Sequence, residues 1–196
     1  MKTNLFRLPN LNRALLWAGI VAAGWLITAV SLHATPTNTA WYVDAATGSD
    51  SNDCLSATTA CLTVGEAVAR ASDDDVIEIA AGVYEENLEI NRALQLVGTG
   101  KDETFLDGGD AGRVISAAGN NVTLNGLTVR HGRVSNLDGG GILNLGTLIL
   151  QSVRVTENTA VNGGGGGIYN SGTLLLYASE VSGNSSDGVG GGVYNW

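Results

Sequence analysis

The chain of 196 residues is 44% hydrophobic and 15% charged, with 28 glycines and only 2 prolines, which excludes a disordered polymer and collagen. This length is typical of one domain or of part of one. Nineteen acidic side chains against ten basic ones give a net charge of −9, so we expect no nucleic-acid partner and no attraction to anionic membrane surfaces.

Residues 1–34 have the pattern of an export signal, in which a basic start precedes an apolar run over residues 14–32. Nineteen helical residues would extend roughly 28 Å, nearly a bilayer core, so an uncleaved signal anchor is the alternative to cleavage after Ala34. Both alternatives place the rest of the chain outside the cytoplasm, secreted or on the cell surface. We expect contact with a membrane only through this segment if it stays uncleaved.

Residues 35–75 are expected to form an N-terminal cap region. Cys54 and Cys61 are the only cysteines, and an oxidising compartment favours a disulfide between them over two free thiols. The neighbouring residues 50–53 (Asp-Ser-Asn-Asp) offer oxygen ligands for calcium, but they lack the glycine and distal glutamate of an EF-hand loop. We therefore expect a hydrogen-bonded turn and no cofactor, with calcium as the alternative.

A short amphipathic helix is predicted directly after the second cysteine. Thr63 and Glu66 have the spacing of a capping box. The apolar residues that follow at helical spacing are Val64, Ala67, Val68 and Ala71. Such a helix can cover the open end of a stack of strands, which would otherwise expose apolar side chains and unpaired strand edges.

Residues 76–196 contain an internal repeat of about 25 residues. The segment 139–150 (GGGILNLGTLIL) returns as 165–176 (GGGIYNSGTLLL), and a third copy begins at Gly190. Within each unit the apolar residues alternate in short runs, about three per unit, which predicts strands separated by glycine and asparagine corners. Units of this kind bury a face only by stacking. The sequence thus predicts an all-β, single-stranded parallel β-helix. Since a new unit begins just before residue 196, we expect the chain to be the front part of a longer protein, with a partner that covers the last coil as the alternative.

Several segments add a family resemblance. The segments that carry it are Trp41–Asp44, Gly48–Asp50, Cys61–Val68, Asp75–Ile79, Ala81–Asn87 and Leu96–Gly98. They resemble the opening of pectin-lyase-like right-handed parallel β-helix proteins. The GGGIxNxGTLxL units resemble the repeats of bacterial surface proteins of that superfamily, including polymorphic outer-membrane proteins. The resemblance implies the fold; it implies no single activity, because the superfamily contains enzymes and non-catalytic adhesins.

Two sets of side chains recur at equivalent positions of the repeat. The asparagines are Asn144, Asn170 and Asn195 at one corner, and Asn158 and Asn184 at another. We interpret them as amide ladders that satisfy the backbone of the turns. Tyr169 and Tyr194 are expected to stack, with the alternative that they hold a sugar ring.

The sequence offers little chemistry beyond these ladders. Fifteen of the nineteen acids lie between Asp44 and Asp110, and the coils over residues 112–196 hold only four. Arg130-His131 could suggest a general base, but we do not expect that role, since no carboxylate is seen at a matching position of the repeat. We therefore predict no catalytic and no metal-ligating residues. The expected function is a non-catalytic adhesion, interaction or structural module with glycans or other surface proteins as partners; the alternative is carbohydrate binding or polysaccharide cleavage by a lyase or glycoside hydrolase.

Overall fold

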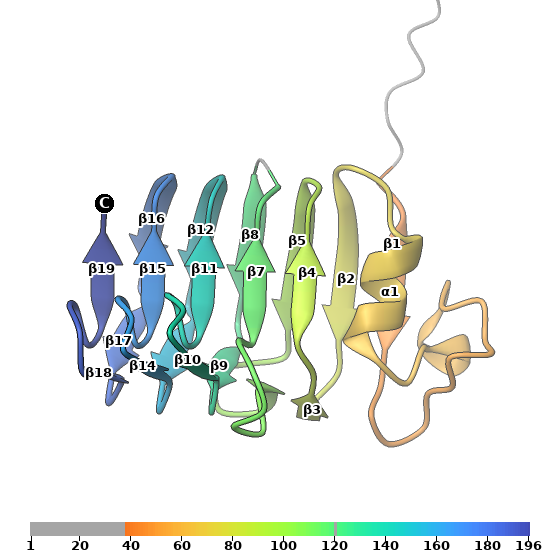
Figure 1. Cartoon of the computed structure of the whole chain (residues 1–196). Helices are drawn as coiled ribbons and strands as arrows, with labels where there is room; N and C mark the ends of the chain where they lie inside the picture. The colour runs from red at the N-terminus through yellow and green to blue at the C-terminus, as the bar shows by residue number, and fades with distance from the viewer. Residues whose placement is uncertain (1–37, 120) are drawn as a thin grey trace, which may run out of the picture. The chain divides into compact units, whose positions relative to one another are not determined.

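The computed structural model describes residues 38–119 and 121–196 (Figure 1). The predicted export segment, residues 1–34, and its cleavage site lie outside these residues. Within the described ranges, no helix is both long enough and apolar enough to cross a membrane.

The strands form four parallel sheets, and within each sheet neighbouring strands come from successive coils. Sheet A consists, in spatial order, of β1 (Ala40–Val43), β2 (Asp75–Ile79), β5 (Leu94–Gly98), β8 (Val122–Asn125), β12 (Thr147–Gln151) and β16 (Thr173–Tyr177). Sheet B consists of β3 (Gly82–Glu85), β6 (Thr104–Asp107), β9 (Thr128–Arg130), β13 (Arg154–Thr156) and β17 (Glu180–Ser182). Sheet C consists of β4 (Leu88–Ile90), β7 (Ile115–Ala117), β11 (Ile142–Asn144), β15 (Ile168–Asn170) and β19 (Val193–Asn195). Sheet D consists of β10 (Arg133–Ser135), β14 (Thr159–Val161) and β18 (Ser185–Ser186).

This arrangement is a parallel β-helix, so the predicted fold class is confirmed. Leu148 pairs in register with Val122 on one side and Leu174 on the other, which places equivalent residues of the repeat directly over one another. The later coils carry four short strands, where the apolar runs predicted about three. The fourth is the sheet D strand, and in β14 Ala160 is the one residue that is buried.

The core is one apolar column enclosed by the sheets. In most strands of sheets A, B and C, alternate side chains point into it, as the twofold periodicity requires. Among the fully buried members are Ile77, Leu96, Leu124, Leu150, Ile115, Ile142 and Ile168. Because the column is shared by all coils, each coil is stabilised mainly by its neighbours.

Helix α1 (Val64–Arg70) lies at the β1 end of the stack (Figure 1). The Thr63 hydroxyl accepts a hydrogen bond from the Glu66 amide at 3.3 Å, which is half of the predicted capping box. The other half is replaced, because Glu66 pairs with Arg70 at 2.7 Å and the Thr63 amide donates instead to Asp50 Oδ1 at 3.0 Å. The next two amides, those of Val64 and Gly65, donate to the carboxylate of Glu86. Burial raises the pKa of Glu86, and these amide hydrogen bonds partly oppose the rise.

A loop over residues 44–62, called the cysteine loop here, covers the outer edge of β1. It contains the 3₁₀ turn η1 (Ala57–Thr59) and the disulfide between Cys54 and Cys61. The Tyr42 amide donates to the Cys54 carbonyl at 2.8 Å and the Asp44 amide to the Cys61 carbonyl at 2.9 Å. The β1 edge of sheet A is therefore hydrogen-bonded and protected from pairing with another chain.

Candidate functional sites

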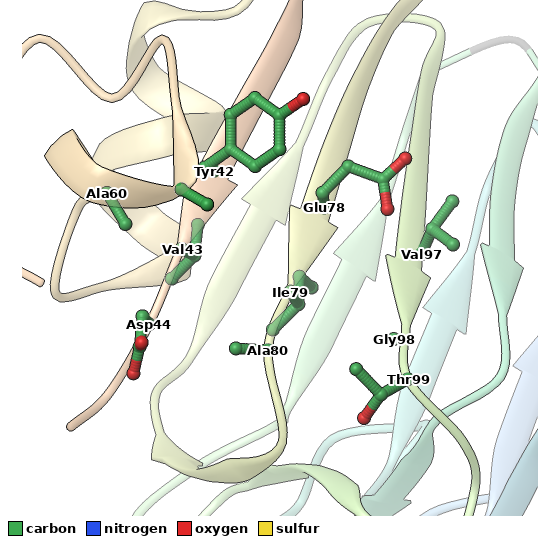
Figure 2. A pocket seen from close by; sticks show the side chains of 11 residues that line it. Tyr42, Val43, Asp44, Ala60, Glu78, Ile79, Ala80, Val97, Gly98 and Thr99 are labelled. Carbon is green, nitrogen blue, oxygen red and sulfur yellow. The ribbon is translucent and has the colours of Figure 1, made fainter. Parts of the chain in front are cut away.

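A cleft of about 240 Å³ lies between the cysteine loop and the outer face of sheet A (Figure 2). Tyr42, Glu78 and Val97 stand side by side on β1, β2 and β5, because the strand register pairs Tyr42 with Glu78 and Glu78 with Val97. Ala57 and Ala60 line the cleft from the cysteine loop. The walls are thus largely apolar, with an aromatic ring and a carboxylate adjacent on the sheet.

The two carboxylates of this cleft differ in their surroundings. Asp44 accepts hydrogen bonds from the Thr47 hydroxyl at 2.7 Å and the Ala46 amide at 2.8 Å, and these bonds lower the pKa of Asp44. Glu78 makes no hydrogen bond and no ion pair with any described residue. The sequence does not predict this cleft, since the alternation of β2 predicts an outward Glu78 but not that the cysteine loop approaches it.

A second cluster corrects the interpretation of His131. The His131 Nδ1 atom lies 2.9 Å from Asp107 Oδ2, and its Nε2 atom lies 3.0 Å from Glu157 Oε2. The expectation that no carboxylate lies at a matching position of the repeat was wrong, since Glu157 follows His131 by 26 residues, one full repeat. Asp107 was overlooked because it precedes His131 by 24 residues rather than by a full repeat, and it meets the ring from the adjacent strand, where it pairs with Arg130.

The same cluster continues along sheet B. Arg130 Nε lies 2.7 Å from Asp107 Oδ2, and its guanidinium lies over the Phe105 ring at 4.3 Å. Burial by itself would raise the pKa of Asp107, but hydrogen bonds from the Gly109 amide, Arg130 and His131 together lower it. Asp107 is therefore held as a carboxylate. A general base needs a free ring nitrogen directed at a substrate, and here both nitrogens of His131 face carboxylates.

Tyr169 and Tyr194 lie on successive strands of sheet C, with ring centroids 5.4 Å apart and the rings tilted by 45°. They line a hollow of about 360 Å³ together with Asp138 and Trp196, whose side chain is 81% exposed. Asp138 accepts a hydrogen bond from the Gly164 amide at 2.6 Å. Partial burial and the nearby Asp138 and Tyr194 raise the pKa of Tyr169, so its hydroxyl stays protonated at neutral pH.

The structure brings the repeated asparagines into two files. Asn144 Nδ2 donates to Asn170 Oδ1 at 2.5 Å, and Asn170 Nδ2 donates to Asn195 Oδ1 at the same distance. At the other corner Asn158 Nδ2 donates to Asn184 Oδ1 at 2.9 Å. Asn144, Asn158 and Asn170 are buried, so these bonds satisfy polar groups that would otherwise be costly to bury.

The candidate calcium ligands are engaged by the protein. Asp50 accepts hydrogen bonds from the Leu62 and Thr63 amides, and Asp53 accepts from the Leu55 amide and the Thr59 hydroxyl. Among the residues that the structure describes, no three His, Cys, Asp or Glu side chains are placed to share a metal ion. The two aspartates thus fasten the turns of the cysteine loop.

The fold and its stacked strands define the class of protein as a parallel β-helix. No family model matches the sequence, and no curated protein matches it.

Two solved structures are similar in fold. One is a pectin methylesterase variant in complex with a hexasaccharide, with 17% identity and a TM-score of 0.48 over 78% of this chain and 55% of that one. The other is pectin methylesterase PemA from Erwinia chrysanthemi, with 16% identity and a TM-score of 0.47 over 72% of this chain and 54% of that one. This chain thus spans about half the length of the solved proteins it matches. At such identity the likeness concerns the fold and not the activity.

Proposed function

We propose that this chain is an exported, non-catalytic β-helix module of a secreted or cell-surface protein, with a role in adhesion, interaction or structure. The observation that supports this most is how the acids of the later coils are engaged. Hydrolysis of a polysaccharide requires one carboxylic acid to protonate the leaving oxygen and a second carboxylate to activate water or attack. In residues 112–196 the structure gives each acid a protein partner instead.

These partners are specific. Glu157 pairs with His131, and Glu180 accepts from the Ser182 hydroxyl at 2.6 Å. Asp138 and Asp187 accept from the backbone amides of Gly164 and Asn162 in the neighbouring loop. Each acid therefore has a structural role. Asp138 and Asp187, which accept hydrogen bonds from backbone amides, hold adjacent loops together.

Turnover assays on a panel of polysaccharides, with pectin included, test this role. We expect no product above the background of the Asp107→Asn, Asp138→Asn and Glu157→Gln variants. Turnover by the purified full chain that any of these substitutions abolishes would overturn the non-catalytic role.

Export is tested separately by sequencing the N-terminus of the protein recovered outside the cytoplasm, where cleavage after Ala34 is expected.

Carbohydrate binding is the second candidate function, and the Tyr169–Tyr194 pair supports it. Two tilted aromatic rings beside a carboxylate offer apolar faces and a hydrogen-bond acceptor, a combination that suits a sugar ring. We expect glycan binding, if this role holds, to fall at least tenfold in Tyr194→Ala. The matched control is Tyr177→Ala. Tyr177 is also an exposed tyrosine, but it lies on β16 of sheet A, whereas the hollow lies on sheet C. Silence of the full chain on a glycan array would contradict this candidate.

A further inference from the structure

The cleft between the cysteine loop and sheet A has the size of one side chain. Its volume of about 240 Å³ is below the roughly 300–1,000 Å³ of pockets that enclose drug-sized ligands. Apolar groups form most of the lining, from Val97 on β5 and Ala80 after β2 to Ala57 and Ala60 in the cysteine loop. A largely apolar cleft of this size can hold the methylene stem of a long side chain.

The polar groups of the cleft define the chemistry of the occupant. Figure 2 shows the Glu78 side chain between the Tyr42 ring and Val97, on the same face of the sheet. A carboxylate next to an aromatic ring attracts a cation by direct charge and by the negative face of the ring. Asp44, which also lines the cleft, adds a second negative charge, and none of the described residues that line the cleft is basic.

Glu78 differs from several acids of residues 38–110 whose carboxylates are hydrogen-bonded within the protein. Asp75 binds the Trp41 indole and two backbone amides, Glu86 binds two helix amides, and Asp107 binds Arg130 and His131. Each of them has a structural partner within the described chain, and Glu78 has none. Its carboxylate is therefore available to a ligand.

The charge of the half of the molecule that contains the cleft favours a positively charged macromolecule as the partner. Residues 38–110 carry fifteen acidic and three basic side chains, a net charge of −12, whereas residues 111–196 carry four of each. A field of one sign over half of the molecule raises the rate at which an oppositely charged macromolecule arrives. It does not by itself create a binding site, which the slot beside Glu78 supplies.

From these observations we infer that the cleft binds an arginine or lysine side chain of a basic partner polypeptide. The stem lies against Val97 and the alanines, and the cationic head meets Glu78 and Tyr42. The inference rests on the interaction role proposed above and adds the chemistry of the partner. A divalent cation fits less well, since Asp44 is already hydrogen-bonded to Thr47 and Ala46, and Glu78 alone supplies too few ligands.

The test uses three pentapeptide amides, acetylated at the N-terminus, in which alanines flank a central arginine, lysine or citrulline. Citrulline has nearly the shape of arginine without its charge. We expect the full chain to bind the two cationic peptides roughly tenfold more tightly than the citrulline peptide, as an ion pair and a cation–π contact together imply. The amide resonances of Tyr42, Val97 and Thr99 should shift on titration.

Two matched variants separate the cleft from the general field. Glu78→Gln and Glu85→Gln each remove one negative charge, and Glu85 is exposed on the outer face of β3. We expect Glu78→Gln to abolish the preference for cationic peptides and Glu85→Gln to retain it. Equal loss in both variants, resonance shifts spread over the whole acidic half, or no preference in the unmodified chain would overturn the inference. Any of these results would leave the polysaccharide assays, and with them the non-catalytic role, unaffected.

Discussion

The two halves of this β-helix hold their coils together by different means. Residues 38–110 are acidic and contain seven glycines, and their contacts occur once each, as in the disulfide and the Glu86 cap. Residues 111–196 have no net charge and contain nineteen glycines, and their asparagine contacts recur in successive coils. The contacts that occur once form the capped β1 end and the cleft beside the cysteine loop. The repeated contacts stack further coils on the same apolar column.

The glycines of the repeat show why close stacking requires them. Gly139, Gly165 and Gly190 occupy equivalent positions with φ between 64° and 68°, in the left-handed region that side chains disfavour. A methyl group on Gly165 would also lie 2.4 Å from the Ile168 carbonyl oxygen. Close approach between coils occurs at the next glycine, where a methyl group on Gly166 would lie 2.5 Å from the Gly191 carbonyl oxygen of the following coil.

Truncation of a core leucine should have the largest effect and tests how far the apolar column stabilises successive coils of the repeated half. Leu150 is fully buried on β12, so Leu150→Ala should lower the free energy of unfolding by about 3–5 kcal/mol. Leu176, its register partner on β16, is 46% exposed, so Leu176→Ala should cost roughly 1 kcal/mol. Urea unfolding monitored by circular dichroism measures both, and equal costs would contradict the shared column.

Loss of the disulfide should follow in size, and it affects only the acidic half. For a loop closed by cysteines seven positions apart, the double variant Cys54→Ala, Cys61→Ala should cost about 2–3 kcal/mol. Reduction of the unmodified chain should give the same loss, which serves as the control. Hydrogen exchange should accelerate in β1 and the cysteine loop and stay unchanged in β12; uniform acceleration would show that the cap supports the repeats as well.

The sequence predicted the repeated half far better than the unique half. A period of about 25 residues, the alternating leucines and the paired asparagines are each visible many times, and every copy supports the others. The Asp107–His131 contact and the approach of the cysteine loop to Glu78 each occur once, between residues 24 apart in the first case and 18 or more apart for the lining alanines in the second. No local propensity encodes such contacts, so they could be found only once the strand register was known.

Acidification should weaken the cluster that joins the two halves. The pKa of Asp107 is lowered in the folded protein, so the unfolded chain binds more protons, and stability falls as the pH drops below about 4 through the folded value. Asp107→Asn should remove about 1.5 kcal/mol near neutral pH, as expected for hydrogen bonds to a charged group, and should flatten the decline in acid. Unfolding curves from pH 2.5 to 7 measure this. Parallel declines in variant and parent would contradict the role of Asp107.

The smallest effect is expected for the ion pairs on the outer face of sheet B. Arg154 lies 2.7 Å from Asp102 and 3.5 Å from Glu180, and so connects one acid of the first half to one of the second across successive coils. Asp102 and Glu180 are exposed, so solvent screens these pairs, and Arg154→Ala should cost under about 1 kcal/mol. The cost should shrink further in 1 M salt, where charges are screened within about 3 Å. A salt-independent loss above 2 kcal/mol would instead mean that the arginine stem packs between the coils, and the charge difference between the halves would then matter less to their cohesion than the shared apolar column does.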